Sequence, residues 1–537
     1  MLDMSVLPDR KMTGRGQTAQ EEVFSPLLHR AVRNSIFTGL GTLATFVLGF
    51  LFVGFTIRYL GESRAGYLMT IQAVIGLNAF LCGFGLGAPL IRRVAALYAQ
   101  GDLDTACTVV GSISTVNIVV GVLFALLIVG LFPTIFVWSR LDPIYQMDGF
   151  WATTFLAGSF LLGQVTSPWQ AVYQATQRYD LITALTTLFG LLTGVSGIVV
   201  LNIAPSMSAI AATGFAISVV RLICDVYFVK RLLERAPLPK WQWGEIRPML
   251  RFGGWTYVSS LGGFLFTNLD RLILTTFLGS SVLPYYAIPQ RLYSQIHTAL
   301  SSQFQFLFPM LSAFGDKAAT EIERLEDRLR WFVALTSGAA YTSLTLVGPD
   351  ILGRLVSPEF GRQATLPLIL ACVQGFMNAQ NIVPYFNSWA VGSGAPNAVA
   401  QLLNGILVGL TAIVLIPRYG FLGASIAQLW IGIVVVIHTL WIRRKVSPHA
   451  HPWRWLRAYI SPSLMIIAWL FTVEMATRCV PLSSVVFYAL VIVGGITGLV
   501  VIWLVEKTLF SIEGRWTTLV RASEIPLSWI IGIIFAK

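Results

Sequence analysis

Long apolar stretches, separated by short polar segments, recur along almost the whole chain. A helix needs about 20 apolar residues to cross the hydrocarbon core of a bilayer, and about fourteen stretches satisfy this length. We expect them near 36–57, 67–90, 107–131, 150–172, 181–202, 207–229, 252–275, 285–310, 331–349, 366–388, 397–416, 420–442, 459–477 and 484–505. The pattern therefore predicts an all-α polytopic membrane protein.

The polar segments divide the chain into an ordered set of parts. Two six-helix lobes are expected at 34–229 and 252–442, and an amphipathic cytoplasmic linker at 230–251 lies between them on the membrane surface. No cleavable signal peptide is visible, because the first apolar stretch is long enough to stay in the bilayer. The other expected parts are a cytoplasmic tail at 1–33, two further helices at 443–506 and a cytoplasmic or interfacial tail at 507–537.

Composition agrees with this pattern and narrows the class of protein. Of the 537 residues, 55% are hydrophobic and 12% are charged, whereas soluble chains carry about 25% charged residues. The mean hydropathy is +0.72. A water-soluble fold would need more charge on its surface, and the same values exclude a disordered, coiled-coil or collagen-like chain.

The charge balance indicates how the chain lies in the membrane. A net charge of +12 would favour nucleic-acid binding in a soluble protein. In a membrane protein it is explained by the enrichment of Lys and Arg on the cytoplasmic side. Most Lys and Arg of the loops fall on that side if the N-terminus is inside. We therefore expect cytoplasmic N- and C-termini, an even number of helices and no nucleic-acid partner.

The starts of the two predicted lobes resemble each other at a constant offset. Residues 57–75 match 275–293, and a second match relates 191–201 to 406–416. Repeated halves are usual in secondary transporters, whose substrate site lies between them. In the first match the equivalent residues are Leu60 and Leu278, Gly61 and Gly279, Ser63 and Ser281, Tyr67 and Tyr285, and Gln72 and Gln290.

The sequence contains little that indicates catalysis. A Gly-Lys dipeptide occurs nowhere, so the chain has no P-loop for a nucleoside triphosphate. Asp102 and Asp104 form the one D-x-D pair, which a glycosyltransferase could use to hold a metal, although a solvated turn beside Gly101 explains it better. The cysteines form no C-x-x-C pair, so neither a disulfide framework nor a zinc site is predicted. We expect no enzyme activity, no cofactor and no metal.

Charged residues within the apolar stretches are the strongest candidates for function. An ionisable group at bilayer depth costs at least about 2.5–3.5 kcal/mol, so it usually faces a cavity or a partner. The seventh stretch carries Asn268, Asp270 and Arg271, and the eighth carries Gln290 and Arg291. Asp270 could pair with Arg291 and leave Arg271 free. At least one of the two arginines is a candidate for facing a water-filled lumen.

Further polar residues extend this set. Arg221 and Asp225 lie one helical turn apart and could neutralise each other near the cytoplasmic end. Gln72 and Gln290 occupy equivalent repeat positions and are candidates for facing one central cavity. Amides either bind sugar hydroxyls or join helices, and the sequence does not separate these roles. The remaining candidates are Asn78, Gln380 and Asn381.

A cationic lumen favours an anionic cargo, because Arg forms forked hydrogen bonds to phosphate oxygens. An exporter of cationic drugs would instead need unpaired carboxylates at bilayer depth. Asp225 and Asp270 each lie close to an Arg in the sequence, which weakens that alternative without removing it.

A resemblance to a known family is carried by three segments: RYLGESRAGYLMTIQAV (58–74), GLGAPLIRRVAA (85–96) and residues 252–292 with the run Asp270-Arg271-Leu272-Ile273-Leu274. They resemble the polysaccharide-transport branch of the multidrug/oligosaccharidyl-lipid/polysaccharide exporter superfamily, the Wzx-type flippases. The likeness extends from Asn34 to about Glu506. It implies a MATE-like fold of two pseudo-symmetric six-helix lobes and two C-terminal helices, which opens alternately to either side of the membrane.

The resemblance also implies a function. Such a protein moves an undecaprenyl-pyrophosphate-linked oligosaccharide across the bacterial inner membrane for surface or exopolysaccharide assembly. Arg271 and Arg291 would contact the pyrophosphate or acidic sugars. An H+ or Na+ gradient is the implied energy source, and the implied partners are the phospholipid bilayer, a polysaccharide polymerase, and chain-length or export proteins. The alternatives are a cation-coupled drug exporter, a lipid II flippase and a membrane glycosyltransferase.

Overall fold

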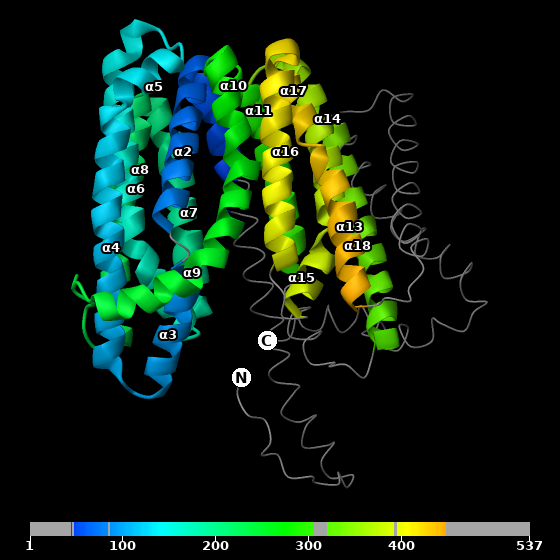
Figure 1. The fold of residues 1–537 in the computed structure, drawn as a ribbon. Coiled ribbons are helices and arrows are strands. Elements are labelled where there is room, and N and C mark those ends of the chain that lie inside the picture. Colours follow the sequence, from blue (N-terminus) through cyan, green and yellow to red (C-terminus); the bar gives the residue numbers. More distant parts are fainter. Residues whose placement is uncertain (1–44, 46–47, 84–85, 304–318, 391–394, 447–537) are drawn as a thin grey trace, which may run out of the picture.

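The computed structural model describes residue 45 and residues 48–83, 86–303, 319–390 and 395–446, and this part of the chain is built from helices joined by short turns (Figure 1). The expected tails at 1–33 and 507–537 lie outside the described residues. The two last predicted helices, 459–477 and 484–505, lie outside them as well.

The helices that precede the linker form a first lobe. Within it α6 packs against α3, α4 and α8, and α7 packs against α8. Its members are a helix at Leu48–Leu60 and α2 (Glu62–Gly83), α3 (Gly87–Ala99), α4 (Leu103–Gly130), α5 (Phe132–Trp138), the short 3-10 helix η1 (Pro143–Tyr145), α6 (Gln146–Ala175), α7 (Tyr179–Ile203) and α8 (Met207–Leu232).

The helices that follow the linker form a second lobe, which lies beside the first in Figure 1. Here α14 packs against α11, α13 and α18, while α16 packs against α9 and α17. Its members are α9 (Trp243–Phe264), the π-helical turn η2 (Leu265–Leu269), α10 (Asp270–Leu278), α11 (Leu283–Gln303), α13 (Ala319–Leu355), α14 (Pro358–Ala379), α15 (Ile382–Ala390), α16 (Ala395–Tyr419), α17 (Phe421–Ala427) and α18 (Trp430–Val446).

Helix α9 contacts both lobes. It packs against α3 and α4 of the first lobe and against α16 of the second. Arg93 of α3 and Glu245 of α9 form an ion pair of 3.5 Å. The backbone N–H of Lys240, in the linker, donates to the carbonyl of Gly111 on α4 at 3.4 Å. The start of α9 is therefore attached to the first lobe, although α9 continues directly through η2 and α10 into the second.

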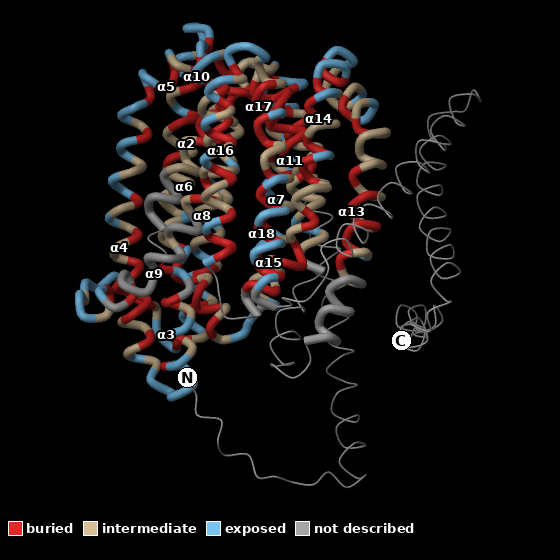
Figure 2. The backbone as a smooth tube through the Cα atoms, turned by 45° about the vertical axis from the view of Figure 1, so that its right-hand side comes forward, coloured by how far each residue is buried: buried red, intermediate tan, exposed pale blue. Residues whose placement is uncertain are grey.

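Six helices of the described part are long and apolar enough to cross a membrane: Leu103–Gly130, Asp180–Ile203, Met207–Leu232, Pro358–Ser388, Ala395–Tyr419 and Phe421–Arg444. Large apolar side chains on them are exposed, such as Leu126 at 66% and Leu410 at 61%. Figure 2 shows exposed positions along the outward side of α4 and buried positions gathered between the helices. These exposed side chains match a lipid environment. The total of about fourteen crossings stays a prediction.

Several predicted helices are divided. The expected helix at 67–90 is split into α2 and α3, the one at 366–388 into α14 and α15, and the one at 420–442 into α17 and α18. The expected loop at 132–149 contains α5 and η1. Apolar content predicts where the chain is inside the bilayer, but it does not predict where a helix breaks, because both halves of a broken helix are equally apolar.

Local sequence explains several helix ends. The side chains of Asp102, Ser206 and Ser357 accept hydrogen bonds from the backbone N–H three residues later and so cap α4, α8 and α14. Gly61 and Gly279 precede α2 and follow α10 with φ values of 82° and 83°. A residue with a Cβ adopts this left-handed region at a cost, so glycine suits both turns.

Candidate functional site

The two lobes meet at one end of the bundle. We call this the upper end; α5, α10 and α17 lie there in Figure 1, whereas α3, α9 and α15 lie at the lower end. Helix α2 of the first lobe contacts α10 and α11 of the second. The ribbons of the two lobes diverge from this contact toward the lower end. The residues where α2 faces η2, α10 and α11 are therefore placed between the lobes.

Asn268 and Gln72 approach this region from opposite lobes. Asn268 lies in the π-helical turn η2, a feature often found at functional sites. Its side-chain oxygen lies 3.3 Å from the position that a Cβ on Gly76 of α2 would take. Gln72 is one helical turn from Gly76, on the same side of α2, and its side chain is exposed.

Arg271 lies one helical turn after Asn268, and Arg291 lies on α11, which contacts α2. Arg291 of α11 is exposed, and its Nη2 lies 3.5 Å from the position of a Cβ on Gly49 in the first lobe. The two guanidinium groups interact electrostatically with each other. Among the described residues, none of the ion pairs involves Arg271 or Arg291. Within the same residues, Arg271 Nε is buried and lacks a hydrogen-bond partner.

Asp270 does not form the expected ion pair with Arg291. Its side chain is 1% exposed and points into the second lobe, where it accepts a hydrogen bond from the Tyr286 hydroxyl and one of 2.6 Å from Gln428 Nε2. Successive residues on a helix point about 100° apart. Asp270 and Arg271 therefore face different surroundings although they are neighbours in the chain.

Gln290 is likewise directed into the second lobe instead of sharing one cavity with Gln72. It is 6% exposed, and its Nε2 donates to Gln374 at 2.8 Å. Gln374 in turn donates to Gln428 at 3.0 Å, which donates to Asp270. The three amides and the carboxylate form a continuous buried network, which satisfies polar groups that would be costly to leave unpaired.

Two other candidate amides are also engaged within the second lobe. Gln380 donates to Ser337 at 3.1 Å, and Asn381 lies 2.7 Å from the Nδ1 atom of His438. These residues join helices, which is one of the two roles open to an intramembrane amide. The side chain of Asn78 lies outside the described residues.

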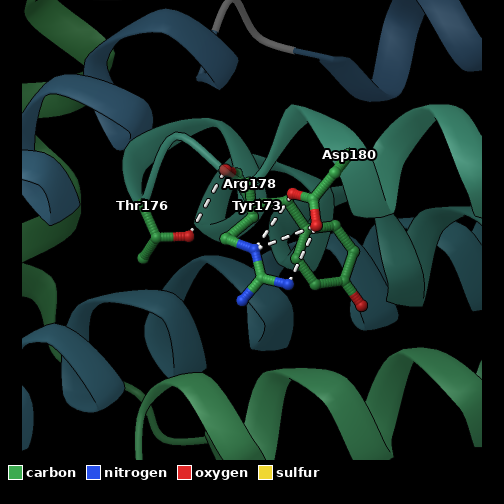
Figure 3. Close-up of polar contacts among 4 residues, drawn as sticks. All are labelled: Tyr173, Thr176, Arg178 and Asp180. Carbon is green, nitrogen blue, oxygen red and sulfur yellow. Dashed lines mark hydrogen bonds and ion pairs between the residues drawn. The ribbon is translucent and has the colours of Figure 1, made fainter. Parts of the chain in front are cut away.

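Arg221 belongs to a different region, at the lower end of the first lobe. Its Nε lies 3.8 Å from buried Asp225, which also accepts a hydrogen bond of 2.9 Å from the Tyr173 hydroxyl. Figure 3 shows the adjacent turn between α6 and α7, where Arg178 binds Asp180 through three hydrogen bonds. Arg221 is thus not brought together with Arg271 and Arg291.

Both carboxylates of the D-x-D pair make contacts within the protein. Asp102 caps α4 by accepting from Thr105 N at 3.0 Å, and this hydrogen bonding with Thr105 lowers the pKa of the Asp102 carboxyl. Asp104 pairs with Arg235 at 3.2 Å. In the described part of the chain, three or more His, Cys, Asp or Glu side chains nowhere gather as metal ligands would. The pair offers little support for a glycosyltransferase.

Sequence reasoning missed Tyr286 and Gln428, the two side chains that hold Asp270. Tyr286 directly follows the repeat residue Tyr285, and Gln428 interrupts an apolar stretch. Gln428 could have been identified from the sequence, since an amide within a membrane segment commonly has a polar partner.

A family model described as "Polysaccharide biosynthesis protein" matches residues 57–347. The "Probable low-salt glycan biosynthesis flippase Agl15" of Haloferax volcanii is 22% identical over 412 residues, which cover 74% of this chain and 81% of that protein. The "Putative O-antigen transporter" of Shigella flexneri is 20% identical over 402 residues, which cover 74% of this chain and 93% of that protein.

Solved structures share the fold. A lipid II flippase MurJ in an inward closed conformation superposes with a TM-score of 0.70 at 10% identity, covering 88% of this chain and 99% of that chain. An inward-facing multidrug resistance MATE transporter of the MOP superfamily gives a TM-score of 0.60 at 13% identity, covering 76% and 98%. The prediction of an all-helical, MATE-like membrane fold is confirmed.

Proposed function

This chain belongs to the polysaccharide biosynthesis protein family, and we propose that it moves a lipid-linked oligosaccharide across a membrane by alternating access. The proposed cargo is an undecaprenyl-pyrophosphate-linked repeat unit used for surface or exopolysaccharide assembly. The glycan and its pyrophosphate pass between the lobes while the lipid tail stays in the bilayer. The similar proteins of Haloferax volcanii and Shigella flexneri are a probable flippase and a putative transporter by name, in agreement with a non-enzymatic role.

The observation that carries this proposal is the pair of arginines between the lobes. Arg271 and Arg291 repel each other, and Arg291 is exposed. A pyrophosphate presents several anionic oxygens to which two guanidinium groups can donate. Its binding would relieve the repulsion of the cations. Gln72 and Asn268, which approach from either side, supply amide groups for sugar hydroxyls.

Two alternatives remain from the same superfamily. A drug exporter would need a carboxylate facing the passage, but Asp270 is directed into the second lobe and hydrogen-bonded there. A lipid II flippase would also carry a pyrophosphate, and the MurJ likeness concerns the fold alone. The family match favours a polysaccharide precursor over either alternative.

The proposal includes an orientation and an energy source. The lower end would face the cytoplasm of a bacterial cell, with both termini on that side, and an H+ or Na+ gradient would drive the cycle. A polysaccharide polymerase and chain-length or export proteins would receive the cargo on the other side.

The test is made in a strain that lacks the gene. Lipid-linked oligosaccharides are extracted and weighed by mass spectrometry, and a membrane-impermeant glycosidase determines which leaflet holds them. We expect a complete repeat unit to accumulate on the cytoplasmic leaflet. If the pool of lipid-linked oligosaccharides is unchanged and the strain is more sensitive to cationic drugs, the proposal is wrong and the drug-exporter alternative is favoured.

Complementation then tests the arginines. We expect Arg271→Gln and Arg291→Gln to leave most of the precursor on the cytoplasmic leaflet at wild-type protein levels. The matched control is Arg178→Gln, because Arg178 is exposed and pairs with Asp180 in the turn between α6 and α7. Full complementation by both test variants would remove the arginines from the proposed site.

A further inference from the structure

We propose that the two repeat-related turns, Gly61–Ser63 and Gly279–Ser281, form a gate that closes the upper end of the passage, and that Glu62 and Tyr285 are its latch. The inference deepens the proposed function, on which it rests for the identity of the cargo. The contacts that define the gate do not depend on the cargo.

The two turns are equivalent in the internal repeat, and each begins with a glycine in the left-handed region. Gly61 and Gly279 align in the repeat and have φ values of 82° and 83°. Each glycine joins the first helix of its lobe to the second. The sharp turn places the next residues, Glu62 and Ser280, at the position where the lobes face each other.

The backbones of the two lobes are in direct contact at these turns. Ser280 donates its N–H to the carbonyl of Ser139 at 3.0 Å, and its hydroxyl lies 2.9 Å from the same carbonyl. The hydroxyl also lies 3.2 Å from the carbonyl of Ser63. A Cβ on Gly66 would be 1.8 Å from the carbonyl oxygen of Ser280, so α2 leaves no space for a side chain there.

The latch is a hydrogen bond between the lobes. The Tyr285 hydroxyl donates to the Glu62 carboxylate. The Tyr285 ring is held by stacking on Phe360 at 4.7 Å and on Phe421 at 5.7 Å between ring centroids. The second lobe therefore presents a fixed hydroxyl to a carboxylate of the first. Separation of the lobes at this end must break this bond and the Ser280 contacts.

The repeat partner of Tyr285 does not form a hydrogen bond between the lobes. Tyr67 is equivalent to Tyr285 in the repeat, but its hydroxyl lies 2.9 Å from Thr153 of the same lobe. Both residues are buried tyrosines near the start of the second helix of their lobe. Of these two tyrosines, Tyr285 bonds across to the other lobe and Tyr67 does not, so the loss of the Tyr285 hydroxyl should change how often the gate opens and the loss of the Tyr67 hydroxyl should not.

The experiment measures the gate directly. Spin labels are attached to Ile144→Cys in the first lobe and Tyr419→Cys in the second, both exposed positions near the upper end, in a cysteine-free version in lipid nanodiscs. Distances are measured by pulsed electron resonance. We expect Tyr285→Phe and Glu62→Gln to increase the ratio of separated to closed lobes by about three- to tenfold, because the first removes the hydrogen bond and the second replaces its charged acceptor by a weaker neutral one.

Tyr67→Phe is the matched control and should leave this ratio unchanged. An unchanged ratio in both Tyr285→Phe and Glu62→Gln would overturn the latch, and so would an equal change in Tyr67→Phe. If Tyr285→Phe fails to fold, Glu62→Gln alone decides, since it keeps the size of the side chain and retains an acceptor of lower charge.

A cross-link tests the gate as a whole. Ser63→Cys and Ser280→Cys, combined in the cysteine-free version, should form a disulfide that stops precursor transfer until a reductant is added. Transfer that continues in the fully cross-linked protein would show that this end need not open. The distance measurements need no cargo. If the latch variants change the distances between the lobes but the deletion strain accumulates no precursor, the proposed function is refuted and the gate is supported.

Discussion

At the scale of single residues, the burial of Asp270 requires an explanation. A polar group removed from water is costly unless it is hydrogen-bonded. Asp270 meets this requirement through Tyr286 and Gln428, and its other oxygen accepts from the backbone N–H of Arg271 at 2.7 Å. The Asp270 carboxylate is thus hydrogen-bonded within the second lobe, and the charge of Arg271 remains available between the lobes.

This arrangement predicts a large loss of stability in Asp270→Ala. The substitution leaves the Tyr286 hydroxyl without its acceptor, at a cost of about 1–3 kcal/mol for a buried group. It also removes one acceptor of the Gln428 amide, which keeps its contact with the Phe266 carbonyl. Thermal unfolding in detergent measures the effect. Gln72→Ala is the control, because Gln72 is exposed, and should change stability by less than about 0.5 kcal/mol. Equal melting temperatures for the two variants would contradict the role assigned to the network.

The sequence makes Arg271 and Arg291 candidates, because charges in apolar stretches stand out, but it does not give the partners of the intramembrane polar residues. The pairing of Asp270 with Arg291 was wrong because it used the proximity of two helices and ignored the direction of each side chain. Gln428 lies 158 positions from Asp270 in the chain, a separation at which sequence pattern gives no information about contact.

At the scale of elements, the approach of α2 to the turn after α10 depends on a glycine. In an exposed helix interior, Ala is more favourable than Gly by roughly 0.5–1 kcal/mol. Gly66 should reverse this preference, because its Cβ position lies 1.8 Å from the Ser280 carbonyl oxygen. Backbone atoms cannot move aside as the end of a flexible side chain can.

We therefore expect Gly66→Ala and Gly214→Ala to have effects of opposite sign. Overpacking at Gly66 should cost roughly 1–3 kcal/mol. Gly214 lies within α8 with open space around its Cβ position, and its replacement should be neutral or stabilising by up to about 1 kcal/mol. Thermal unfolding of both variants under the same conditions is the measurement. A stabilised Gly66→Ala protein would show that the lobes are not this close at the upper end.

The elements also show why the sequence predicted the spans better than their breaks. The stretches at 107–131, 181–202 and 207–229 correspond well to α4, α7 and α8, because each is one continuous helix. The breaks between α2 and α3 and between α17 and α18 fall within apolar stretches. Tertiary packing determines such breaks, and hydropathy does not report it.

At the scale of the whole molecule, the internal repeat was the most informative sequence feature. It predicted two lobes, and the structure shows that its first match forms the contact between them. The repeat could not predict the asymmetry of that contact. Tyr67 and Tyr285 occupy equivalent positions, yet one bonds within its lobe and the other across to Glu62.

The orientation of the molecule is the remaining property at this scale, and it decides which side the gate closes. Exposed basic residues surround the lower end of the first lobe, among them Arg178, Lys230, Arg231, Arg235 and Lys240. Basic residues accumulate on the cytoplasmic side, so we expect the lower end inside. A cysteine-free version is given a single cysteine, either Ile144→Cys at the upper end or Leu238→Cys at the lower end. These side chains are 79% and 75% exposed.

In cells that keep the inner membrane intact but lack the outer membrane, an impermeant maleimide should label Ile144→Cys and leave Leu238→Cys unmodified. Permeabilised cells serve as the control, and both variants should then react. The reverse labelling would place the Glu62–Tyr285 latch on the cytoplasmic side. The passage would then be closed toward the cytoplasm in this structure and could not accept a cargo assembled there, so the proposed direction of transport would require the opposite conformation for loading.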